Sequence, residues 1–152
     1  MEIRLATLSD MDALGFLLTE FFDYNANLQP MYCRANNENG KYPESVIKSS
    51  NADFLVAIES DVALGFIHII QQKTPSFDSV VPHDYAEIMA FMVTAASRGQ
   101  GIGARLIDAA KRWSKARSLD YIELISLDNA EANAFYDHKN FITVSHIRRY
   151  AL

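Results

Sequence analysis

The stretch RGQGIG, residues 98–103, joins an apolar segment, residues 86–94, to an amphipathic one. Glycines let a backbone turn tightly and come close to a ligand, because no Cβ stands in the way. The first N–H groups of a helix have no carbonyl partner, and together with the positive end of the helix dipole they favour an anion. The stretch therefore predicts a strand-to-helix junction that holds a phosphate group, with a pyrophosphate as its natural ligand.

Strand and helix patterns alternate on both sides of this junction. The segment before it is apolar on both faces, as in a strand that is buried on both sides. After it, apolar residues recur at helical spacing to about Arg117. The other predicted elements are a strand at 3–5, a helix opened by Ser9 and Asp12 as a capping box and fading near Asn25, a long loop at 24–42, a short helix from Pro43 to about Ser50, a hairpin of strands 54–58 and 63–70 around Ser60-Asp61, a strand at 121–127, a helix at 130–139 and a last alternating strand at 141–150.

Composition narrows the class of protein. The chain has 152 residues, which predicts one domain over residues 1–152. Its net charge of -5 argues against general affinity for nucleic acid. The lone Cys33 fits a reducing compartment, and neither a long apolar run nor a signal peptide is found, so we expect a soluble cytoplasmic protein. The four histidines lack ligand spacing, so no metal site is expected.

Two motifs resemble those of a known family, the GNAT N-acetyltransferases. Arg98-x-x-Gly101-x-Gly103 resembles the family's signature for the pyrophosphate of acetyl-CoA, and Asn129-x-x-Ala132-x-x-Phe135-Tyr136, ending in Phe141, is similar to its later signature. The resemblance implies an α/β fold with a single mixed, mostly antiparallel sheet of about six or seven strands, flanked by about four helices and splayed at its central parallel pair. Asn140 stands where the family usually has glycine, and because Asn tolerates positive φ, we expect the same left-handed helix stop there.

The same resemblance implies the residues that bind acetyl-CoA. A bulge in the strand before the glycine turn would turn backbone amides of that strand toward the thioester and the pantetheine arm, although an ordinary core strand is the alternative. Asn129 would hydrogen-bond near the pantetheine, or act only as a helix N-cap. The expected cofactor-binding residues are Met92, Val93, Arg98, Gly99, Gln100, Gly101, Ile102, Gly103, Ala104 and Asn129.

Acyl transfer from a thioester to an amine requires a base for the amine and a proton for the leaving thiolate. The resemblance places a phenol, Tyr136, where many family members have the acid, and packing against the cofactor is the alternative role. A carboxylate in so apolar a strand is costly unless it is solvated, paired or functional, which makes Glu87 the candidate base. A solvated strand end or a salt bridge is the alternative role for Glu87, and ordered water would then act as the relay.

The predicted function is transfer of an acetyl group from acetyl-CoA to a primary amine of a small molecule or protein, by direct attack in a ternary complex. The acceptor groove would be walled by residues 24–42 and 143–147, and no membrane partner is expected. The oligomeric state stays open, a homodimer among the alternatives. A non-catalytic acyl-CoA-binding module is a second hypothesis. A third is a dinucleotide-binding domain, because Gly99-x-Gly101-x-x-Ala104 also fits that fingerprint with Asp128 as the ribose-binding acid.

Overall fold

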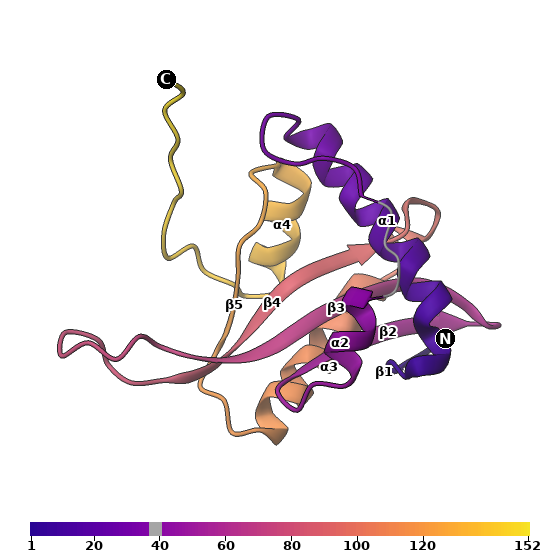
Figure 1. Ribbon diagram of the computed structural model, residues 1–152, viewed down its shortest axis with the longest axis horizontal. Coiled ribbons are helices and arrows are strands. Elements are labelled where there is room, and N and C mark those ends of the chain that lie inside the picture. Colours follow the sequence, from indigo (N-terminus) through magenta and orange to yellow (C-terminus); the bar gives the residue numbers. More distant parts are fainter. Residues whose placement is uncertain (37–40) are drawn as a thin grey trace.

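The computed structural model describes residues 1–36 and 41–152, so positions 37–40 of the predicted loop lie outside the described residues. It contains one sheet in the order β1-β2-β3-β4-β5, with helices on both faces (Figure 1). None of the described helices has the length and apolar character needed to cross a bilayer. The elements are β1 (Glu2–Leu5), a 3₁₀ turn (Leu8–Asp10), α1 (Met11–Leu28), α2 (Lys41–Ile47), β2 (Ala52–Glu59), β3 (Val62–Lys73), β4 (Asp84–Val93), a second 3₁₀ turn (Ala95–Ser97), α3 (Ile102–Ala116), β5 (Ile122–Leu124) and α4 (Ala130–His138).

Two hydrophobic cores lie on opposite faces of the sheet. Successive side chains of a strand point to opposite faces, so Phe54 of β2 packs on the α1 side while its neighbour Leu55 packs on the α3 side. Helix α1 buries Leu14, Leu17 and Leu18 in the first core. Helix α3 buries one apolar stripe in the second, with Leu106, Ile107 and Ala110 fully enclosed. Both cores therefore meet at β2, β3 and β4.

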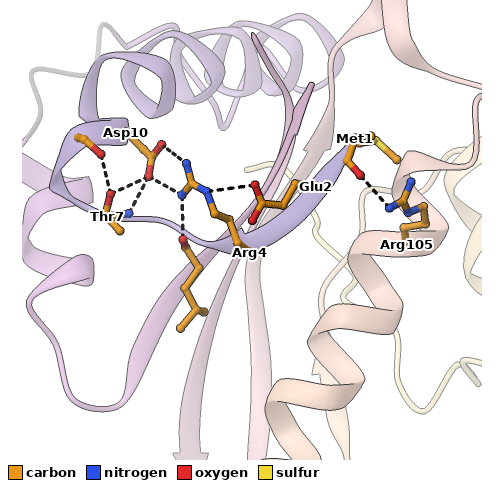
Figure 2. Close-up of polar contacts among 8 residues, drawn as sticks. Met1, Glu2, Arg4, Thr7, Asp10 and Arg105 are labelled. Atoms are coloured by element: carbon orange, nitrogen blue, oxygen red, sulfur yellow. Dashed lines mark hydrogen bonds and ion pairs between the residues drawn. The ribbon is translucent and has the colours of Figure 1, made fainter. Parts of the chain in front are cut away.

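An ion pair near the N-terminus fixes the entry to α1 (Figure 2). The guanidinium of Arg4 donates to both carboxylate oxygens of Asp10 at 2.8 Å, and the same carboxylate accepts the backbone N–H of Thr7 at 2.7 Å. The capping box is thus formed by Thr7 and Asp10, so the prediction of Ser9 and Asp12 was wrong by two residues. The ion pair with Arg4 on β1 fixes the carboxylate of Asp10, which also accepts the Thr7 N–H and so closes the box at these two residues.

The first four strands form an antiparallel meander, as the sequence predicts for the hairpin. Ser60 (φ 50°) and Asp61 (φ 64°) both adopt left-handed conformations between β2 and β3. Two successive residues of this kind give a turn whose twist matches that of the flanking strands. The hairpin prediction is confirmed, and the left-handed stop at Asn140 (φ 63°) is confirmed as well.

The C-terminal side of the sheet differs from the prediction. The α/β class, the mixed sheet and the four α-helices agree with the expected fold, but the described sheet has five strands instead of about six or seven. β5 is limited to Ile122–Leu124, and its parallel pairing with β4 ends at Ile88 and Leu124. Residues 141–150 form no strand, because no neighbouring strand pairs with them among the described residues. As β5 is the last strand, the parallel pair lies at an edge of the sheet and not at its centre.

Candidate active site

A pocket of about 740 Å³ opens where β4 and β5 separate. The two strands pair only up to Ile88 and Leu124, where β5 ends. The rest of β4 and residues 125–127, which follow β5, both line the pocket. Its ends are closed by α1, by the start of α3 and by α4. A cleft therefore lies between the segments 86–94 and 121–127, both of which are predicted as strands.

A bulge in β4 shapes one wall of this pocket. Ile88 pairs with Ile69 and Ala90 pairs with His68, so Met89 is an extra residue without a partner on β3. The bulge reverses which face the following side chains point to: Ile88 belongs to the core under α3, whereas Ala90 and Met92 belong to the core under α1. A bulge also interrupts the ladder, which frees backbone groups of the bulged strand. It lies at Met89, before Met92 and Val93, and both of those residues line the pocket.

The glycine turn has the conformation that its sequence predicts. Gly99 (φ 74°) and Gly101 (φ 77°) are left-handed, and Gly101 is the N-cap of α3. The N–H groups in the first turn of α3, from Ile102 onward, have no carbonyl partner within the helix. Gly103 has a different role, because a Cβ there would lie 3.3 Å from Phe91 and 3.4 Å from Phe135. Glycine thus lets α3 start close to both β4 and α4.

The side chains of Arg98 and Asn129, both expected to bind the cofactor, make contacts within the protein. Arg98 donates from Nε to the carbonyl oxygen of Val93 at 3.2 Å, and its guanidinium lies 5.2 Å from the centre of the Tyr24 ring. Asn129 accepts the backbone N–H of Ala132 at 2.7 Å, so it does cap α4, and its amide lies 3.4 Å from the Tyr24 hydroxyl. Tyr24, on α1, therefore connects the turn before α3 to the start of α4 across the pocket.

Tyr136 lies on α4 among aromatic rings. The centroids of Phe135, Phe141 and Phe91 are 5.4, 5.6 and 6.5 Å from its own ring centre. Burial raises the pKa of the Tyr136 phenol to about 12, so the hydroxyl keeps its proton at neutral pH. The side chain lines the pocket, as a proton donor must.

Glu87 and Gln100 are the two expected site residues that do not line the pocket. Glu87 immediately precedes the pocket residue Ile88, but it accepts a hydrogen bond from Gln72 at 3.0 Å and stands beside Glu123 of β5. Because successive strand residues face opposite sides, its carboxylate lies on the sheet face opposite to Ile88. Its role as base stays a prediction.

The pocket brings together most of the residues expected from the sequence. The expected residues that line it are Met92, Val93, Arg98, Gly99, Gly101, Ile102, Gly103, Ala104, Asn129 and Tyr136. Sequence reasoning missed Phe21 and Ser126, although both line the pocket. Of the predicted acceptor walls, Tyr24, Asn25 and Cys33 are present, whereas residues 143–147 are not among the lining residues. Phe21 lies three residues before Tyr24 on α1, so helical spacing could have predicted that both face the pocket. No local signal in the sequence marks Ser126.

Comparison with known proteins identifies the family. The model of the acetyltransferase (GNAT) family matches residues 14–141, so the chain belongs to this family. A search of curated protein sequences finds no match. Among solved structures, a mutant of the BH1408 protein from Bacillus halodurans is similar at 24% identity, with a TM-score of 0.94 over 100% of this chain and 99% of that one.

Two further structures share the fold at lower identity. A transcriptional regulator from Bacillus halodurans C-125 is 20% identical, with a TM-score of 0.79 over 99% of each chain. The aminoglycoside N-acetyltransferase AAC(6')-Iy in complex with CoA is 15% identical, with a TM-score of 0.75 over 99% of this chain and 98% of that one. Only β4 and β5 pair in parallel, and the other neighbouring strands are antiparallel. A dinucleotide-binding domain has a mostly parallel sheet, so the fold differs from that hypothesis.

Proposed function

We propose that the chain transfers an acetyl group from acetyl-CoA to a primary amine, by direct attack of the amine in a ternary complex. The observation that carries this proposal is the pocket between β4 and β5, which ends at the left-handed glycines and the free amides at the start of α3. A pyrophosphate would bind to those amides, and the pantetheine arm would follow β4 past Met92 and Val93.

The roles of the side chains follow from their positions. Tyr136 donates a proton, or a hydrogen bond, to the sulfur as the thiolate leaves. Glu87 takes a proton from the attacking amine through water. Arg98 and Asn129 hold the walls of the pocket in place, because their side chains form hydrogen bonds with residues of β4, α1 and α4.

A small-molecule amine is the acceptor that the comparisons favour. The aminoglycoside N-acetyltransferase with the same fold binds CoA, and aminoglycosides carry several cationic amines. The net charge of -5 favours such acceptors by long-range attraction. The Tyr136 phenol, which keeps its proton at the pocket wall, supports catalysis over a module that binds acyl-CoA without turnover.

The deciding experiment measures CoA binding by calorimetry in Gly101→Glu and Gly101→Ala. A Cβ at Gly101 meets no atom within 4 Å, so both variants keep the packing and share the cost of a left-handed non-glycine residue. Glu adds a negative charge at the phosphate position, so it should weaken CoA binding at least about 100-fold relative to Ala. Equal affinities in the two variants, or tighter binding of NAD than of CoA, would contradict the phosphate assignment.

A second assay tests turnover. Purified protein with acetyl-CoA and a panel of amines, including aminoglycosides, polyamines and lysine peptides, should release free thiol with at least one acceptor. CoA binding without thiol release across the panel would favour the non-catalytic module instead.

A further inference from the structure

Tyr24 of α1 lines the pocket, but the proposed reaction gives it no role. Its ring lies 5.2 Å from the guanidinium of Arg98, and its hydroxyl accepts a hydrogen bond from the side-chain amide of Asn129 at 3.4 Å. Arg98 in turn donates to the carbonyl oxygen of Val93 at the end of β4. Figure 1 shows the C-terminal part of α1 beside the start of α4. Tyr24 thus links the β4 side of the pocket to its α4 side.

The contact between Asn129 and Tyr24 reaches α4 itself. Asn129 is the N-cap of α4, and its side-chain oxygen accepts the backbone N–H of Ala132 at 2.7 Å. An amide side chain has one oxygen and one NH2 group, so the NH2 group is the part that remains for a partner outside the helix. It donates to the Tyr24 hydroxyl. One side chain therefore caps α4 and attaches its first turn to α1.

Helix α4 is weakly packed, so a hydrogen bond at its start can affect its position. None of its residues is buried, and the strand before it, β5, pairs with β4 through three residues. Its ring contacts with β4 lie in its second half, where Phe135 and Tyr136 are 5.7 and 6.5 Å from Phe91. Segments with few buried contacts open locally at a low cost in free energy. The start of α4 is therefore the part whose distance from β4 depends most on Tyr24.

We propose that Tyr24 is a positioning residue that holds the start of α4, and with it Tyr136, at the distance from β4 that suits the pantetheine arm of CoA. The inference rests on the proposed function, because it assumes that CoA binds in this pocket. The ring of Tyr24 stays beside Arg98 at the glycine turn, and its hydroxyl fixes Asn129. Without the hydroxyl, α4 should move more freely against β4, and bound CoA should dissociate faster.

The first test needs no ligand and measures the hydrogen–deuterium exchange of the wild type and of Tyr24→Phe by mass spectrometry. Phe keeps the ring beside Arg98 and removes the hydroxyl. A hydrogen bond between neutral groups contributes modestly to stability, so we expect the amides of residues 130–138 to exchange about twofold to tenfold faster. The amides of β2 and β3 should exchange at the wild-type rate. Equal exchange of α4 in the two proteins would overturn the proposal.

A double-mutant cycle then tests whether the effect passes through Asn129. Asn129→Ser keeps a good N-cap and removes the amide donor. Because Tyr24→Phe and Asn129→Ser remove the same hydrogen bond, α4 should exchange no faster in the double variant than in the faster single variant. Additive increases would mean that the two residues act separately, which overturns the proposal. Tyr32→Phe is the matched control: Tyr32 also packs against an arginine, Arg149 at 4.4 Å, but it does not line the pocket, so the exchange of α4 should not change.

The second test measures the binding of CoA to the immobilised wild type, Tyr24→Phe and Tyr32→Phe by surface plasmon resonance. CoA should dissociate about twofold to tenfold faster from Tyr24→Phe and at the wild-type rate from Tyr32→Phe. Faster exchange of α4 without faster dissociation of CoA would break the link between α4 and the cofactor and overturn the proposal. A wild type that does not bind CoA would instead contradict the proposed function, and the exchange data would still decide whether Tyr24 holds α4.

Discussion

The sheet has two parts that are held together differently. The body, β1 to β4 with α1, α2 and α3, encloses both hydrophobic cores, and α3 alone has seven buried residues. The wing consists of β5, α4 and the C-terminal segment 141–152. It pairs with the body through three residues of β5, and α4 has no buried residue. The body therefore carries the stability, whereas the loosely paired wing leaves space at its boundary for a ligand.

The largest expected effect compares one phenylalanine from each part. Phe54 in the body is 1% exposed, and Phe135 in the wing is partly buried. Phe54→Ala should lower the free energy of unfolding by about 3–5 kcal/mol, and Phe135→Ala by about 1–2 kcal/mol. Urea unfolding followed by the fluorescence of Trp113 measures both. Similar losses would show that the wing contributes as much stability as the body.

A second prediction concerns acid stability and His68. This imidazole is 5% exposed, its Nε2 has no hydrogen-bond partner among the described residues, and burial lowers its pKa to about 4. The unfolded chain then binds a proton at higher pH than the folded one. Stability should be complete above about pH 6.5 and fall by about 3 kcal/mol as the pH decreases to 4.

The control variant for this effect is His68→Gln, which cannot titrate. Its stability should be lower at neutral pH but flat between pH 6.5 and 4. Asp10 does not produce this slope: the ion pair with Arg4 holds the pKa of that carboxyl below its usual range, so its stabilising contribution is present at neutral pH and is lost only below about pH 4. An unchanged slope in His68→Gln would assign the acid sensitivity to other groups.

A third prediction concerns Tyr136, which lines the pocket at the boundary between the body and the wing. Tyr136→Phe keeps the ring contacts and removes the proton donor, so turnover should fall about tenfold to a thousandfold while the affinity for acetyl-CoA stays near wild type. Tyr85→Phe is the matched control, because Tyr85 lies on β4 outside the pocket and stacks on Tyr121 at 5.0 Å. Equal turnover in Tyr136→Phe and wild type would make Tyr136 a packing residue.

The body was predictable because its signals are local. Ser60-Asp61 between two alternating segments is enough to predict a hairpin, and the glycines before α3 are enough to predict its start. Asn140 lies in the wing, but its left-handed conformation followed from an equally local signal, the tolerance of Asn for positive φ. In each case the residues that determine the structure lie within a few positions of one another.

The wing was predicted less well because its structure depends on distant partners. Residues 141–150 have a strand pattern, but a strand needs a neighbouring strand, and the local sequence does not say whether one lies beside it. The orientation of Arg98 and Asn129 toward Tyr24 likewise depends on the position of α1. Their contacts within the protein could not be read from the two motifs that contain them.

The smallest expected effect concerns Glu87, which lies where the two parts meet and pairs in register with Glu123. If Glu87 takes a proton from the amine through water, Glu87→Gln should lower kcat/KM about tenfold at neutral pH and less at high pH, where the free amine is already deprotonated. Glu123→Gln removes a neighbouring carboxylate of the same charge and serves as the control. The measurement is the pH profile of kcat/KM for the three proteins on one acceptor. A uniform decrease at all pH values in both variants would mean that the carboxylates only attract the cationic acceptor, and superimposed profiles would leave water alone as the base.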